Sequence, residues 1–274
     1  MSDFPTIGGQ LAVPFGDTAT SAAVTVTAPA TANVMGGWSE LLSADLNQFG
    51  GTSVEVIIYS DDSGGSEFLV NIGVGPADAM TIIPALRFVL SPNLNGRTGW
   101  QYTIPVNVPA GVAVYAQCQC SVASDFIYVS GSIFGAGFLA SPGLVQVDPI
   151  GVDYSASQGT TFVAGATNTW GTTVELTASA DFDYRGFFVG IGHDGQTSWA
   201  IQVAKYRIGI GAAGNEHWVY YWRTQYTSAE VLGPTGGGFV PHQIAAGTRI
   251  AVQGMASTGN AVSRTKDIIL YGVR

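Results

Sequence analysis

The sequence predicts an all-β protein made of two tandem, internally duplicated antiparallel β-sandwiches that resemble jelly rolls. Glycine and proline, 37 and 12 residues of 274, divide the chain into short segments rich in valine, isoleucine, threonine and aromatic residues. The same phrase also occurs twice: residues 72–77 read IGVGPA, and residues 208–213, 136 positions later, read IGIGAA. Short strands with frequent turn signals are typical of two-sheet sandwiches.

The offset of 136 recurs along the chain. Residues 43–45 (SAD) return as 179–181, and Gly111 and Gln117 return as Gly247 and Gln253. A solenoid repeat spans about 20–50 residues, so this period is that of a whole domain. We predict a first module with an N-terminal arm over residues 1–136 and a second module over residues 137–274.

Turn residues bound each predicted strand of the first module. The nearest helix candidate, 38–49, is short, and its counterpart 174–182 has the pattern of a strand, so we expect no helix there. The N-terminal arm, residues 1–20, has little core pattern of its own, so either the body of its own domain or a neighbouring subunit holds it, and we favour the neighbour. The predicted strands are 21–28, 38–43, 52–60, 67–75, 80–90, 100–107, 112–122 and 126–134.

Residues 112–122 have the clearest strand pattern, because small apolar side chains alternate with polar ones. Cys118 and Cys120 share the apolar face, which predicts two buried free thiols. The copy at 248–256 has the same alternation. Gly111 and Gly247 precede the two strands in turns that require a positive φ.

The second module repeats this organisation. Gly73 and Gly75, matched by Gly209 and Gly211, leave one face of one strand bare in each module, which indicates either close approach of another backbone or a local bulge or bend. Residues 135–150 are too apolar for a free linker, so we expect the modules to pack together. The predicted strands are 161–165, 173–179, 186–192, 199–210, 216–225, 239–244, 248–256 and 265–273.

Charged residues make up only 11% of the chain, against about 25% in a typical soluble domain. Such a surface is buried against partners, coated with uncharged polar residues, or both. No apolar stretch approaches the about 20 residues of a membrane-spanning helix, and no basic cluster accompanies the net charge of −9. We therefore expect neither membrane nor nucleic-acid partners. The N-terminus lacks the pattern of a secretory signal, which predicts synthesis in a cytoplasm.

No arrangement of residues predicts catalysis. The histidines 193, 217 and 242 accompany no nucleophile motif. The acid pairs Glu175 with Asp181 and Glu216 with Glu230 could face one another across a cleft, although solvated charges are the more ordinary interpretation. The acidic loop 61–65 has the pattern of a hairpin tip rather than a calcium site. We expect no catalytic residues, no cofactor, no metal and no enzyme activity, with a polysaccharide-acting enzyme as a third alternative.

An aromatic row is the best candidate for a binding or interface site. Trp218, Tyr220 and Trp222 share one face of the predicted strand 216–225. Aromatic residues in such a row can stack against sugar rings, but they also fill cores and subunit interfaces. Core or interface is the favoured interpretation.

The phrases of the repeat resemble modules of virion structural proteins of tailed bacteriophages, over roughly residues 38–135 and 170–273. The phrases that carry the resemblance are FLVNIGVGPA, YRIGIGAAGNE, PVNVPAGVAVYAQ and PHQIAAGTRIAVQG. The resemblance implies a β-sandwich building block of a head, tail or fibre that works by assembly, and it carries over no functional residues.

The sequence and the resemblance together predict a structural protein of a bacteriophage particle, made in the host cytoplasm and incorporated into the virion. Its expected partners are copies of itself, as a homo-oligomer and specifically a trimer, and other virion proteins. The alternative is a pair of carbohydrate- or receptor-binding modules that recognise a cell-surface glycan through Trp218, Tyr220 and Trp222.

Overall fold

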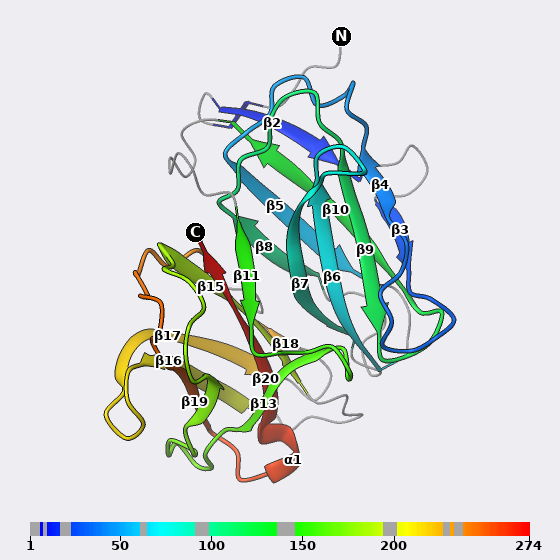
Figure 1. Cartoon of the computed structure of the whole chain (residues 1–274). Helices are drawn as coiled ribbons and strands as arrows, with labels where there is room; N and C mark the ends of the chain where they lie inside the picture. The colour runs from blue at the N-terminus through cyan, green and yellow to red at the C-terminus, as the bar shows by residue number, and fades with distance from the viewer. Residues whose placement is uncertain are drawn as a thin grey trace.

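The computed structural model describes residues 6–7, 10–16, 23–60, 65–90, 99–135, 146–193, 202–226, 231–232 and 238–274. Its regular structure is β throughout, apart from the single turn of α1 (Ala261–Arg264) (Figure 1). The strands form four antiparallel sheets, which pair into two sandwiches, so the predicted fold class is confirmed. No helix among these residues is long and apolar enough to span a membrane.

The first sandwich has two sheets in jelly-roll order. One sheet runs β1-β2-β10-β5-β8, with β3 also paired to β10, and the other runs β4-β9-β6-β7. The strands are β1 (Thr6–Ile7), β2 (Gln10–Phe15), β3 (Val24–Thr27), β4 (Ser39–Leu42), β5 (Ser53–Tyr59), β6 (Ser66–Val74), β7 (Thr81–Leu90), β8 (Trp100–Ile104), β9 (Val114–Cys120) and β10 (Phe126–Phe134).

The second sandwich repeats this order. One sheet runs β11-β20-β13-β12, with β15 also paired to β20, and the other runs β14-β19-β16-β17-β18. The strands are β11 (Val147–Ile150), β12 (Val152–Asp153), β13 (Gln158–Val163), β14 (Val174–Thr177), β15 (Gly186–His193), β16 (Gln202–Ile210), β17 (His217–Tyr226), β18 (Val231–Leu232), β19 (Ile250–Ala256) and β20 (Thr265–Val273).

The pairing register repeats at the offset seen in the sequence. Ile72 on β6 pairs with Ala116 on β9, and Ile208 on β16 pairs with Val252 on β19. Gly111 and Gly247 have φ values of 74° and 82° in equivalent turns. The structure therefore places the repeated residues on equivalent strands, while the boundary at 136/137 lies outside the described residues and stays a prediction.

Alternation of side chains builds the core of each sandwich. Val114, Ala116 and Cys118 of β9 face inward and are fully buried, as are Ile250 and Val252 of β19. Cys118 and Cys120 are free thiols inside the first core, as predicted. Burial raises the pKa of each thiol from 9.0 to about 12.

Two expectations about elements are wrong. The described part of the N-terminal arm, β2, pairs with β10 of its own module, and Val13 and Phe15 are buried in that core, so no neighbour is needed to hold it. The expected strand 239–244 is reduced to isolated bridges at Val240 and Ile244. Proline at 241 lacks the amide that a continuous ladder requires.

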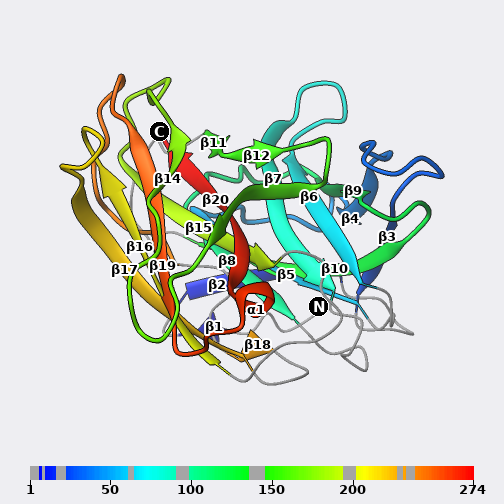
Figure 2. The same cartoon turned by 90° about the horizontal axis from the view of Figure 1, so that it is seen from below.

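The two sandwiches pack face to face. β7 lies against β15 and β11, and its Arg87 reaches Asp267 of β20. Figures 1 and 2 show the two modules side by side. Phe188, Ile269 and Tyr271 of the second module belong to the same buried cluster as the first module's core. The predicted packing of the modules is therefore seen in a shared hydrophobic core.

Candidate functional site

The predicted aromatic row does not lie on one face of β17. Tyr220 pairs with Ile208, but Trp218 pairs with Gly209, so a β-bulge at Val219 turns the strand between them. Tyr220 and Trp222 point inward and stack at 5.3 Å between ring centroids, and Trp222 is 8% exposed. The expectation of a shared face is wrong because the bulge inserts one residue and reverses the alternation.

Trp218 points to the outside of the sheet and packs against a guanidinium group. The Cζ of Arg207 lies 3.8 Å from the ring centroid of Trp218 and 4.1 Å from that of Trp170. Arg207 also donates to the side-chain oxygen of Gln253, whose amide donates to the carbonyl of Gly171. The guanidinium is therefore held between two indoles in a fixed orientation.

Gly209 makes room for this arrangement. A Cβ on Gly209 would lie 2.8 Å from the Trp218 ring, and a Cβ on Gly73 would meet the side chains of Trp38 and Met80. Large side chains therefore cover the bare faces at Gly73 and Gly209, whereas the nearest atoms at Gly75 and Gly211 belong to the backbone of the turns that follow.

Two further cations share the outside of this sheet. Lys205 on β16 lies directly opposite Arg223 on β17, and Tyr221, on the same side, is 56% exposed. None of Lys205, Arg207 and Arg223 forms an ion pair with an acid of the described residues. We call the group Trp170, Lys205, Arg207, Trp218, Tyr221 and Arg223 the β16–β17 outer face.

A second polar cluster lies at the junction of the modules, and it is fully buried. Arg87 of β7 donates from Nε and Nη2 to the two carboxylate oxygens of Asp267 of β20, at 2.7 and 2.9 Å. Glu67 pairs with the same guanidinium. The hydroxyl of Tyr102 donates to the Arg87 carbonyl, and that of Tyr271 donates to the Ala85 carbonyl. Every charge of this cluster is paired, so we interpret the cluster as a structural contact between the two modules.

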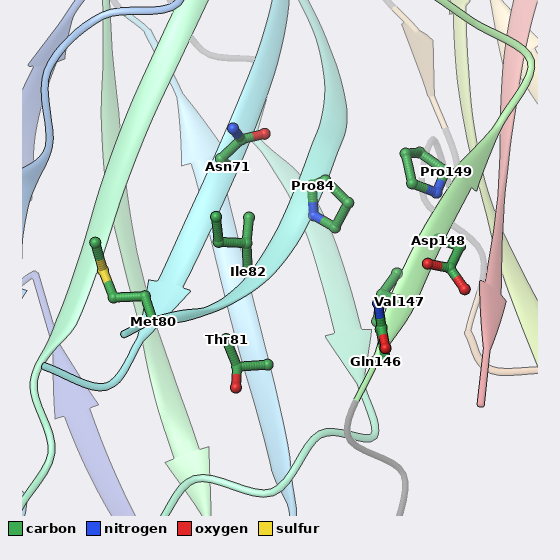
Figure 3. Close-up of a pocket in the computed structure, with 9 residues that line it drawn as sticks. All are labelled: Asn71, Met80, Thr81, Ile82, Pro84, Gln146, Val147, Asp148 and Pro149. Carbon is green, nitrogen blue, oxygen red and sulfur yellow. The ribbon is translucent and has the colours of Figure 1, made fainter. Parts of the chain in front are cut away.

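A groove of about 640 Å³ runs along the rim of the junction. Figure 3 shows Asn71, Ile82 and Pro84 on one side of it and the segment 146–149 on the other. Two of its polar side chains already have partners: Asn71 accepts from the Ala85 amide, and Asp148 accepts from Arg274. The groove therefore offers a ligand few uncommitted polar groups.

One acid from each of the two pairs singled out in the sequence is bound by the same arginine. Arg249 binds both Glu175, at 2.6 Å, and Glu216, at 2.9 Å. Hydrogen bonds from the backbone amides of Glu216 and Gly214, and from Arg249, lower the pKa of Glu216. Glu230 and residues 61–64 lie outside the described residues, and so does the side chain of His193. Within the described part of the chain, no three His, Cys, Asp or Glu side chains gather as a metal site would require.

No family model and no curated protein sequence matches the chain. Among solved structures, PNGF-II aligns with 96% of this chain at 11% identity and a TM-score of 0.40, and the chain spans 65% of its length. A peptide-N(4)-(N-acetyl-β-D-glucosaminyl) asparagine amidase aligns over 91% of this chain and 95% of its own at 9% identity and a TM-score of 0.40. The STIV MCP, a viral capsid protein, aligns over 92% and 96% at 9% identity and a TM-score of 0.35.

These similarities correct one expectation. The expectation that this protein is not an enzyme does not stand, because the solved structures to which the chain is similar include an amidase. All three TM-scores lie below 0.5, and none of the three proteins lends this chain a site or a substrate.

Proposed function

We propose that the protein is a structural subunit of a virus particle, of the kind that builds tailed bacteriophages, and that it acts by assembling with copies of itself and with other virion proteins. The observation that carries this proposal is the module junction. Because Arg87 and Asp267 are paired in a core that both modules share, the chain forms one rigid two-module block. A block whose two halves are alike is suited to repeated packing in a particle.

The surface supports the same function. Leu46 and Phe182 occupy the same position of the repeat, in the turns after β4 and β14, and they are 57% and 42% exposed. The chain has only 10 basic residues, and natural β-proteins protect open sheet edges chiefly with such charges. Contacts with neighbouring subunits would cover both the apolar turns and the edges.

Analytical ultracentrifugation of the full chain at micromolar concentration tests the proposal. We expect a discrete oligomer, specifically a trimer, and a shift to smaller species for Leu46→Asp combined with Phe182→Asp. Val122→Asp is the control, because Val122 is 46% exposed but its repeat counterpart is Thr258. A wild-type protein that sediments as a stable monomer would contradict assembly and favour a binding module that acts alone.

A further inference from the structure

Arg87 and Arg223 occupy equivalent positions of the repeat, but their environments differ. Arg87 pairs across the sheet with Leu69, and Arg223, 136 positions later, pairs in the same register with Lys205. The outward face that carries Arg87 is buried against the second module. Among the described residues, the equivalent face of the second module, the β16–β17 outer face, makes no hydrogen bond, ion pair or ring contact with the first module, and Arg207 reaches Gln253 of β19 in its own sheet.

The receiving side of the junction is also repeated. In the second module it is the outward face of β15 and β20, where Gly190 pairs with Ile269 and Gly192 with Asp267. In the first module the equivalent strands are β5 and β10, where Ile57 pairs with Ser130 and Tyr59 with Tyr128. We call Glu55, Ile57, Tyr59, Tyr128, Ser130 and Ser132 the β5–β10 outer face.

Each chain therefore contains one such junction, between its own two modules. The β16–β17 outer face and the β5–β10 outer face are the two surfaces from which a second junction of the same kind could form. We propose that the β16–β17 outer face of one subunit packs against the β5–β10 outer face of a second copy, in the arrangement that joins the two modules within a chain. The inference rests on the proposed assembly function, and it identifies the surfaces that assemble.

The chemistry of the two faces fits this contact. Tryptophan, tyrosine and arginine, which dominate the β16–β17 outer face, are the residues that contribute most to protein interfaces. The β5–β10 outer face presents the aromatic rings of Tyr59 and Tyr128, 5.3 Å apart, and one acid, Glu55, with no cation among its six residues. Lys205 and Arg223 repel one another directly across the strands, and an acidic neighbour relieves this cost.

The contact is heterologous, since it joins two different faces, and such contacts generate a ring when the rotation closes. A chain already contains one junction of this kind between its two modules. Three chains joined in the same way would alternate internal and intersubunit junctions around a ring of six similar modules. This ring of three chains is the arrangement that we propose for the predicted trimer.

A cysteine pair tests the contact directly. Gly51 bridges to Val108 as Tyr184 bridges to Ile244, so Ile57, six residues after Gly51, takes the position of Gly190 in the second module. A Cβ on Gly190 would lie 3.0 Å from the Cβ of Arg87, so Ile57 of one copy and Arg223 of the next should come close enough for a disulfide. Ile57→Cys with Arg223→Cys should form covalent oligomers on mild oxidation, resolved on a non-reducing gel. Ile57→Cys with Val163→Cys is the control, because Val163 is 45% exposed on β13, outside the predicted contact.

Charge reversal gives a second, independent readout. Arg223→Glu should shift the sedimenting species from oligomer to monomer, whereas Arg185→Glu, a reversal at an exposed arginine elsewhere in the second module, should leave the oligomer intact. A wild-type oligomer that neither forms the disulfide nor responds to Arg223→Glu overturns this interface while the assembly function stands. A wild-type monomer overturns both.

An acidic glycan is the competing occupant of this face, because its three cations pair with no acid of the described residues and lie beside aromatic rings. Oligogalacturonate, with neutral dextran as its control, can be titrated into the wild-type protein and Arg223→Glu by calorimetry. The interface predicts no binding that depends on Arg223. Binding that is lost in Arg223→Glu, with the oligomer unchanged, assigns the face to an acidic glycan and overturns the inference.

Discussion

Arg87 and Asp267 lie 180 positions apart in the sequence, and their side chains meet in a fully buried, two-pronged ion pair that joins the modules. The backbone amide of Gly159 also donates to Asp267, and the Tyr271 hydroxyl accepts from the Arg87 amide. A single cation thus connects both sheets of the junction.

Removal of this cation should destabilise the whole chain. Arg87→Met leaves Glu67 and Asp267 as buried carboxylates without their partner, at a cost of about 3–5 kcal/mol in the free energy of unfolding. Arg249→Met removes two ion pairs, with Glu175 and Glu216, that are more exposed than the Arg87 pair, and should cost less. Guanidinium denaturation measures both. Equal losses in the free energy of unfolding would show that Arg87 contributes no more to stability than the more exposed Arg249 does.

The bulge in β17 predicts different roles for two tryptophans. Trp222→Ala should cost about 3–5 kcal/mol, because it opens a cavity among Tyr206, Tyr220 and the second core. Trp218→Ala removes a half-exposed ring and its contact with Arg207, at a cost of about 1 kcal/mol. Chemical denaturation of the two variants distinguishes them, and comparable losses would place both rings in the core.

The repeated turn predicts matched effects in the two modules. Gly111→Ala and Gly247→Ala each place a Cβ at a positive φ, although no atom lies within 4 Å of that Cβ. The cost is then backbone strain alone, about 1–2 kcal/mol at each site. Thermal and chemical unfolding should show near-equal destabilisation. A clear difference would mean that the two turns are not equivalent.

The buried thiols predict slow modification at neutral pH. Cys118 and Cys120 should react with a thiol reagent far more slowly in the native protein than in guanidinium, because burial keeps both in the neutral form. Native labelling at the rate of the unfolded control would show that the core of the first module is open.

Alkaline pH should destabilise the fold. Because the folded-state pKa of each thiol is about 12 against an ordinary 9.0, their contribution to stability is complete below pH 9 and is lost as pH rises toward 12. Burial raises the pKa of Tyr271 as well, which adds to the same trend. The free energy of unfolding, measured across this range, should fall with pH, and less steeply in Cys118→Ala. A constant value would refute the assignment.

The sequence by itself determined the local structure and the repeat. Alternation along residues 112–122, the glycines at 111 and 247 and the shared phrases at 72–77 and 208–213 are properties of short segments, and the structure has the corresponding strands and turns. The prediction of a strand over 239–244 was wrong, because Pro241 lacks the backbone amide that a continuous hydrogen-bonded ladder requires.

The tertiary structure alone decided which faces meet. Arg87 and Arg223 occupy equivalent positions of the sequence repeat. Only the packing of the modules buries Arg87 at their junction and leaves Arg223 exposed. A single inserted residue at Val219 likewise separates Trp218 from Tyr220. Both outcomes depend on register and contact between segments far apart in the chain, which local periodicity does not encode.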